Sequence, residues 1–179
     1  MLSQLKGKDN WTYKAVYKVV NAHSEGDNII LANHKCECCH GKILPLKRES
    51  EKSACISDFV SPEKDYVGVF ATSVNVENIL TTLREQGREY DAMLLQLFAD
   101  RLAEALSVWQ YEKVKQQWGV ENMIRPAVGY SCLPNHSLKQ DLLEILENKI
   151  NITLTETGAM MPVSSVCGLY ISNSKAKYF

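Results

Sequence analysis

YVGVFATSVNVENILTTLREQGREYDAMLLQLFADRLAEALSVWQYEKVKQQ, residues 66–117, is the stretch that decides the fold. It begins with residues 66–73, whose β-branched and aromatic side chains predict a strongly apolar strand. Asn75 can then cap a helix through 76–86, and Gly87 can end it because glycine readily adopts the left-handed conformation of a helix C-terminus. The first half of the stretch therefore predicts a strand followed directly by a helix.

The second half, from about Tyr90 to Gln117, predicts one long helix. Apolar residues recur there at spacings of three and four, which places them on one face of a helix and predicts that this face packs on the core. The residues of the predicted core face are Leu94, Phe98, Leu102, Ala105 and Trp109.

Strands flank this stretch on both sides. Residues 13–20 predict a half-buried strand, a turn at Gly26, Asp27 and Asn28 follows, and 28–40 predicts the returning strand of a hairpin. Two further strands are expected at the C-terminal end, at 151–157 and 165–172.

A shorter helix is expected before those last strands. Ser137 followed by Gln140 matches a capping box, so the helix should begin there and run to about Lys149. Its predicted inward residues are Leu138, Leu142, Ile145 and Leu146. Strict strand–helix–strand alternation is absent, so we predict an α+β fold, a single domain with a bent, mainly antiparallel sheet flanked by helices.

The composition is that of an ordinary soluble globular domain, with 179 residues, 45% hydrophobic and 23% charged. A net charge of −1 and a pI near 6.4 give no reason to expect nucleic acid or an acidic membrane as a partner. We find no apolar run near the roughly 20 residues that span a bilayer, and MLSQLKGKDNW lacks the apolar core of a signal peptide. We therefore expect a cytoplasmic protein whose six cysteines are thiols.

The segment HKCECCH, residues 34–40, contains five residues of metal-ligand type: His34, Cys36, Cys38, Cys39 and His40. On a strand only the even positions share a face, and neighbours two apart lie about 7 Å from each other, too far to close a tetrahedron without a bend. The sequence has no second CxxC or HxxxH pair. A metal site and a strand with incidental thiols both stay open, and the spacing favours the strand.

IRPAVGYSCLPNH, residues 124–136, offers two kinds of chemistry. Cys132 and His136 could be a nucleophile and its base, but no third group that orients the imidazole is identifiable, so the sequence favours a structural role for both in the loop. Arg125 could instead fork onto a ligand carboxylate, while the backbone near Ala127 and Gly129 approaches that ligand closely. An ordinary surface arginine is the alternative.

Glu104 is a further candidate because it lies at the apolar side of the long helix, where a carboxylate needs a partner. Arg101, within one turn, would supply an ordinary salt bridge.

Several separated segments together resemble the activation domain of cobalamin-dependent methionine synthase. They are ACISDFVSPEKDYVGVFATSV, YDAMLLQLFADRLAEALSVW, IRPAVGYSCLPNH, LTETGAMMPVSSVCGLYIS and SKAKYF. The combination of DRLAEA, RPAxGY, TETxAM and VxGLY is specific as a set, and the matched segments fall between about residues 26 and 179. The resemblance makes 1–179 an activation-like domain from which the N-terminal part of the family domain is missing.

The resemblance implies that the protein binds S-adenosylmethionine and needs no catalytic residue of its own. In this family the domain presents the ligand's methyl group to cobalamin carried by the methionine synthase core. An electron from flavodoxin or a reductase and that methyl group then restore methylcobalamin. The protein's part is positioning, because cobalt supplies the nucleophile.

Carried over residue by residue, the resemblance assigns Arg125 to the methionine carboxylate and Glu104 to the cationic part of the ligand. The backbone at Ala127, beside Gly129, would contact the ligand, and Tyr130 would face the cobalamin. Near the C-terminus, Tyr178 matches a ligand-site tyrosine and Phe179 is adjacent to it.

The sequence also departs from the family. DNWTY, from Asp9, matches a ligand-contacting DWTPF-like segment only superficially. Gly119 stands where the family has a second glutamate, and Glu121 is the nearby acid that could replace it. The family cysteine falls at Leu133, so Cys132 inherits no role. Each lost charged contact would cost roughly 1.5–3 kcal/mol of ligand binding.

Two functions follow from the resemblance. The first is a module that binds S-adenosylmethionine and reactivates a separate methionine synthase in trans. The second is a docking or regulatory relative that contacts a cobalamin protein without binding S-adenosylmethionine. Metal or thiol chemistry at 34–40 is a third, so whether the protein is part of a catalytic system stays open at this stage.

Overall fold

The computed structural model describes residues 11–32, 41–50, 53–147 and 149–179. Its main feature is a six-stranded sheet in the order β3-β2-β1-β4-β8-β5, in which each neighbouring pair is antiparallel. The strands of this sheet are β1 (Thr12–Glu25), β2 (Asn28–Leu31), β3 (Lys42–Pro45), β4 (Asp65–Asn75), β5 (Met123–Ile124) and β8 (Ser165–Ser172). The predicted α+β class with a mainly antiparallel sheet is confirmed.

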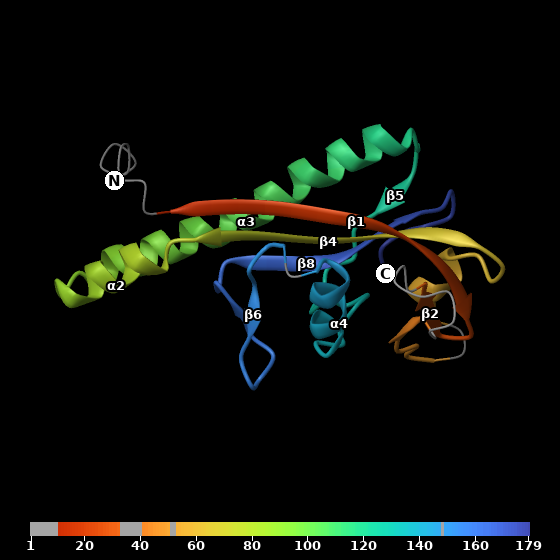
Figure 1. The fold of residues 1–179 in the computed structure, drawn as a ribbon, viewed down its shortest axis with the longest axis horizontal. Coiled ribbons are helices and arrows are strands. Elements are labelled where there is room, and N and C mark those ends of the chain that lie inside the picture. The colour runs from red at the N-terminus through yellow and green to blue at the C-terminus, as the bar shows by residue number, and fades with distance from the viewer. Residues whose placement is uncertain (1–10, 33–40, 51–52, 148) are drawn as a thin grey trace.

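Helices lie on the two faces of the sheet, as Figure 1 shows. The helical elements are η1 (Ile56–Phe59), α2 (Glu77–Glu85), α3 (Glu89–Trp118) and α4 (Leu138–Ile145). The long α3 runs along one face and α4 lies across the other, near a separate two-stranded sheet of β6 (Thr153–Leu154) and β7 (Met160–Met161). Each face of the sheet has its own cluster of buried residues.

Alternation along β4 explains why the sheet separates two cores. Successive strand residues point to opposite faces, so Val67, Val69 and Ala71 pack with α4, whereas Phe70 and Val74 pack with α3. Because both faces are covered, the strand is apolar along nearly its whole length, which is the pattern that predicted it.

The predicted hairpin is confirmed where the structure describes it. Glu25 pairs with Asn28 across a turn at Gly26 and Asp27, and Gly26 has a φ of 57°, which glycine adopts without strain. The segment HKCECCH lies outside the described residues.

The long helix has nearly the predicted bounds, but the predicted core face is mostly wrong: Leu102 packs against the core and Leu94 is partly buried, whereas the other three predicted residues are exposed. Phe98 and Trp109 are exposed, at 38% and 57%, and Ala105 is exposed as well. The residues that α3 buries are Ala92, Leu95, Ala99, Ala103, Ser107, Gln110 and Val114. Small side chains form this face because the sheet opposite supplies bulk, with Phe70 and Tyr170 stacked at 4.6 Å between ring centroids.

The helices α2 and α4 begin close to the predicted residues, but neither is capped as predicted. The N-cap of α2 is Val76 rather than the predicted Asn75, although the side-chain oxygen of Asn75 accepts a hydrogen bond from the backbone N–H of Glu77. Ser137 makes no capping bond; Asn135 accepts hydrogen bonds from both the N–H and the hydroxyl of Ser137 instead. The helix α4 ends at Ile145 rather than near Lys149, because Glu147 has a φ of 56°, in the left-handed region.

Most of the predicted inward face of α4 is confirmed. Leu138, Leu142 and Leu146 are buried, Ile145 is partly buried, and Leu143 is buried as well.

Candidate functional site

A cluster of polar side chains gathers where α3, the loop after β5 and the C-terminal segment meet. We call Glu104, Ser107, Arg125, Tyr130 and Tyr178 the α3–loop cluster. These residues come from three separated parts of the chain and are joined by hydrogen bonds and one ion pair. Four of the five are among the residues singled out from the sequence.

Strand β8 holds the loop in place. After β5 pairs with β8, the chain stays against it, because Ala127 bridges Gly168, Val128 donates to the carbonyl of Cys167, and Leu169 donates to the carbonyl of Pro126. A Cβ atom at Gly168 would lie 2.2 Å from the Pro126 carbonyl oxygen. Glycine in the VCGLY motif therefore allows the loop backbone to rest on the strand.

A tight turn then points Tyr130 outward. Gly129 has a φ of 98°, donates to the carbonyl of Leu133, and lies over His136, whose Cε1 would be 3.0 Å from an added Cβ. Tyr130 is 54% exposed at the tip of this turn. The glycine of RPAVGY thus serves the turn, and the tyrosine after it faces solvent.

Arg125 is the centre of the cluster. Its Nη1 donates to the hydroxyl of Ser107 at 2.6 Å, its Nη2 lies 3.9 Å from Oε2 of Glu104, and its Cζ lies 5.8 Å from the centroid of the Phe70 ring. The side chain is only 17% exposed. Within the described residues one of its five N–H groups has a hydrogen-bond partner, so this guanidinium is largely buried and still has free donors.

Glu104 is the acidic partner, and its contacts differ from the alternative suggested by the sequence. Its Oε1 accepts a hydrogen bond from the Tyr130 hydroxyl at 2.6 Å, and its ion pair is with Arg125. Arg101 makes no ion pair with it among the described residues. The hydrogen bond to Glu104 is the main cause that raises the pKa of Tyr130, because an ionised phenol would face the carboxylate; burial and Arg125 act less strongly, with Arg125 opposing.

The C-terminal segment completes the cluster. The backbone N–H of Arg125 donates to the hydroxyl oxygen of Tyr178 at 2.7 Å, and the hydroxyl of Ser131 donates to the carbonyl of Phe179 at 3.2 Å. The amide of Asn122 donates to three carbonyl groups of this segment, those of residues 173, 174 and 176. Tyr178 and Phe179 are therefore brought beside the loop.

Other candidates lie apart from the cluster. Cys132 packs against the core on the α4 side, and burial raises the pKa of its thiol, which is the opposite of what a nucleophile needs. The structure gives no hydrogen bond between Cys132 and His136 in the part of the chain it describes. In the same described ranges, no group of three or more His, Cys, Asp or Glu residues is arranged to hold a metal.

Gly119, which stands where the family has its second glutamate, lies at the C-terminal end of α3. Gly119 is the left-handed C-cap of α3, with a φ of 63°. Glu121 is exposed just beyond it, and the described residues show no contact between it and the α3–loop cluster. Glu121 as a substitute therefore gains no support from its position.

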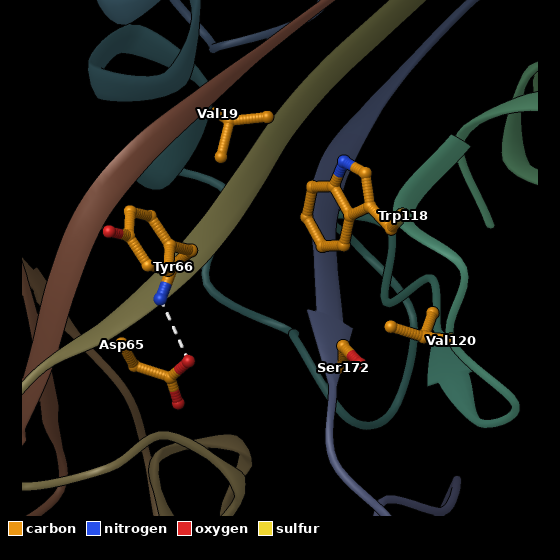
Figure 2. Close-up of a pocket in the computed structure, with 6 residues that line it drawn as sticks. All are labelled: Val19, Asp65, Tyr66, Trp118, Val120 and Ser172. Atoms are coloured by element: carbon orange, nitrogen blue, oxygen red, sulfur yellow. Dashed lines mark hydrogen bonds between the residues drawn. The ribbon is translucent and has the colours of Figure 1, made fainter. Parts of the chain in front are cut away.

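A separate hollow of about 370 Å³ lies where α3 ends over the sheet. Figure 2 shows Tyr66 and Val19 on one side of it and Trp118 and Val120 on the other. Both oxygens of the Asp65 carboxylate in its lining accept backbone hydrogen bonds, from Ser61 and Tyr66. It shares no residue with the α3–loop cluster.

Sequence reasoning missed Ser107 as a cluster residue. It is fully buried, lies four residues after Ala103 on the face that α3 packs on the sheet, and is polar. A serine in an otherwise small and apolar stripe is the signal that could have identified it, had the stripe been assigned correctly.

The geometry suits a ligand that carries both charges. Arg125 offers free donors for an anion, and Glu104 lies beside it and could bind a cation. Arg125 begins a loop whose backbone is held in place by β8.

The family model described as "Vitamin B12 dependent methionine synthase, activation domain" matches residues 1–179. The chain belongs to this family.

A solved structure supports the same relationship for this activation domain. The structure described as the MetH reactivation domain bound to AdoHcy is 29% identical, with a TM-score of 0.87. The alignment covers 99% of this chain and 64% of that one, so the activation domain described here spans less than two thirds of that relative.

In the described residues no helix is long and apolar enough to cross a membrane.

Proposed function

We propose that this activation domain binds S-adenosylmethionine at the α3–loop cluster and presents its methyl group to the cobalamin of a methionine synthase core. The observation that supports the proposal most directly is the set of unused hydrogen-bond donors on the largely buried side chain of Arg125. The guanidinium is 17% exposed and uses one of its five N–H groups within the described residues, and none of its remaining nitrogen atoms is both buried and unsatisfied, so these donors stay accessible to a ligand. A carboxylate accepts two parallel bonds from such a fork, and the methionine part of the ligand carries one.

The other parts of the site fit the rest of that ligand. Glu104 would face the ammonium or sulfonium charge, and the backbone at Ala127 and Gly129 would lie along the ligand because β8 fixes it there. Tyr130 is exposed and would be accessible to an arriving partner, and Tyr178 and Phe179 contact the loop at Arg125 and Ser131. Family membership and the AdoHcy-bound relative support this assignment.

The chemistry requires a partner and an electron. Cobalamin bound to the partner would supply the nucleophile after accepting one electron from flavodoxin or a reductase. The methyl group would pass to it while the sulfur keeps the electron pair of the broken C–S bond and leaves as S-adenosylhomocysteine. The domain itself binds, orients and holds the ligand, which is catalysis by positioning. We place this activity in the cytoplasm and take the partner as a separate polypeptide, so that the domain acts in trans.

Titration calorimetry with S-adenosylmethionine tests the binding claim. We expect saturable one-site binding by the wild-type protein and a loss of roughly 10- to 150-fold in Arg125→Ala, the equivalent of one charged hydrogen-bonding group. Arg88→Ala is the matched control, because Arg88 is an exposed arginine that pairs with Asp91 away from the cluster. Absence of binding by the wild-type protein would refute the proposal.

Reconstitution tests the action in trans. A methionine synthase core that lacks its own activation domain, held as inactive cob(II)alamin, would be mixed with the reductant, S-adenosylmethionine and this domain. We expect the cobalamin absorbance to change to that of the methylated form only when the domain is present, and not with Arg125→Ala. If the core stays inactive at saturating domain, action in trans is wrong even where calorimetry shows binding.

A docking relative without ligand is the second candidate, and one contact favours it. The Tyr130 hydroxyl already occupies Oε1 of Glu104 at 2.6 Å, so the acid of the site has an internal partner. Capture of a cobalamin-bearing methionine synthase core by immobilised domain that shows no calorimetric response to S-adenosylmethionine would select this candidate.

A further inference from the structure

The hydroxyl of Ser107 links the two charged residues of the cluster. It accepts a hydrogen bond from Nη1 of Arg125 at 2.6 Å and donates to the backbone carbonyl of Glu104 at 2.8 Å. The residue is fully buried between α3 and the sheet. Because its hydrogen is committed to Glu104, its lone pairs are left for the guanidinium.

Arg125 and Glu104 are separated by more than the length of a hydrogen bond. At 3.9 Å they attract each other but do not form the hydrogen-bonded pair of about 2.8 Å that an arginine and a carboxylate prefer. The hydrogen bond to Ser107 holds the guanidinium beside Glu104 rather than on it, and Cζ of Arg125 lies 5.8 Å from the centroid of the Phe70 ring, within the range of a cation–π interaction. A direct pair would neutralise both groups and occupy the donors that a ligand carboxylate needs.

We propose that Ser107 is a positioning residue that keeps Arg125 apart from Glu104, so that the site accepts a ligand carboxylate on Arg125 and a ligand cation on Glu104. This inference rests on the proposed function and adds a determinant that recognises the carboxylate. Ser107 acts through Arg125 and has no contact with the reacting methyl group. Removing its hydroxyl lets the guanidinium swing onto Glu104.

The test is carboxylate discrimination by Ser107→Ala. Affinity is measured by calorimetry for S-adenosylmethionine and for its decarboxylated analogue, which keeps the sulfonium and the amine. We expect the preference of the wild-type protein for the carboxylate-bearing ligand to fall roughly tenfold in Ser107→Ala, the loss of one charge-assisted hydrogen bond in positioning. A merely structural role would weaken both ligands together and leave the ratio unchanged.

Controls separate this effect from loss of fold. Alanine is a better helix former than serine, so α3 is retained in the variant. Thr72→Val is the matched control, since the Thr72 hydroxyl is also buried and donates to the carbonyl of Ala103 on α3. It should leave the ratio at the wild-type value.

A ligand-free crystal structure of Ser107→Ala gives a second readout. We expect Arg125 and Glu104 to approach to about 2.8 Å, as a direct pair. A wild-type protein that binds neither ligand overturns the proposed function. A wild-type protein that binds S-adenosylmethionine, with an unchanged ratio and separation in Ser107→Ala, overturns only the role of Ser107.

Discussion

The hydroxyl of Tyr178 accepts a hydrogen bond from the backbone N–H of Arg125, 53 residues earlier in the chain, at 2.7 Å. This contact ties the C-terminal segment to the residue on which the ligand proposal depends. Asn122, three residues before Arg125, holds the same segment through three carbonyl groups. Residues 122 and 125 therefore both hold the C-terminal segment, and the Tyr178 hydroxyl can orient the peptide of Arg125.

Replacing Tyr178 with phenylalanine should weaken ligand binding without unfolding the protein. The ring stays, and one hydrogen bond worth about 0.5–1.5 kcal/mol is lost at the backbone of Arg125. We expect S-adenosylmethionine affinity to fall about two- to tenfold by calorimetry, with a thermal midpoint within a few degrees of the wild-type value. Tyr13→Phe, an exposed tyrosine on β1 outside the cluster, should change neither quantity; equal affinities for the two variants would contradict the role of Tyr178.

The raised pKa of Tyr130 predicts a pH dependence of stability. Its folded-state pKa lies above the ordinary value of about 10, mainly because Glu104 accepts its hydrogen bond. Above that ordinary value the folded state binds more protons than the unfolded state, so the free energy of unfolding falls as the pH rises through the folded pKa. Glu104→Gln removes the carboxylate charge and should bring the pKa back toward 10.

Difference titration can isolate this tyrosine. The absorbance of Tyr130→Phe near 295 nm is subtracted from that of its parent, first in the wild-type protein and then with Glu104→Gln. We expect the midpoint to move to lower pH in the glutamine background. Glu112→Gln, an exposed acid on the same helix, should leave the midpoint in place; identical midpoints in all three backgrounds would show that Glu104 does not control Tyr130.

Burial predicts which described thiols are inert. Cys167 on β8 is 1% exposed, and burial raises the pKa of its thiol to about 12, so the reactive thiolate at pH 8 is depleted on the order of a thousandfold relative to a free cysteine. Pulse alkylation followed by mass spectrometry should leave Cys167 unmodified until denaturant is added. Fast labelling of Cys167 in the native protein would mean that β8 opens locally or is less covered than the structure shows.

The strands and helices could be predicted because their patterns are local, whereas the face of α3 could not. Large apolar residues such as Phe98 and Trp109 recur at helical spacing, and this pattern predicts that they face the core. The sheet instead presents Phe70 and Tyr170, which leave room only for small residues such as Ala99 and Ala103. The face that α3 buries depends on the size of the side chains that the sheet presents to it. The sequence of α3 alone does not contain those side chains.

Four members of the α3–loop cluster could be singled out from the sequence, but their contacts could not. The residues themselves make Arg125 and Glu104 candidates, and the family resemblance adds Tyr130, but the protein partner that the sequence offers Glu104 is Arg101, within one turn on the same helix. The actual partners come from 21 and 26 residues later in the chain. Long-range pairing depends on how β5 and the following loop are held on β8, which requires the assembled sheet.

Gly168 belongs to the VxGLY motif, lies on β8 and contacts the loop that carries the ligand-site backbone. Gly168→Ala should therefore lower both the stability of the fold and the affinity for the ligand. An added Cβ would lie 2.2 Å from the carbonyl oxygen of Pro126 and 2.8 Å from Cα of Ala127, both backbone atoms that cannot rotate away. We expect a loss of about 3 kcal/mol or more in the free energy of unfolding, measured with urea, because the loop must leave β8. Ligand binding should fall with it, since the peptide of Ala127 is displaced.

Gly26→Ala is the matched control for this substitution. Gly26 has a φ of 57° but no atom within 4 Å of an added Cβ, so alanine there costs only the left-handed backbone conformation, about 1–2 kcal/mol. It should leave S-adenosylmethionine affinity unchanged, because the hairpin turn is remote from the α3–loop cluster. If Gly168→Ala were no more destabilising than Gly26→Ala, the close packing of the RPAVGY loop on β8 would be wrong, and with it the fixed backbone that the ligand site requires.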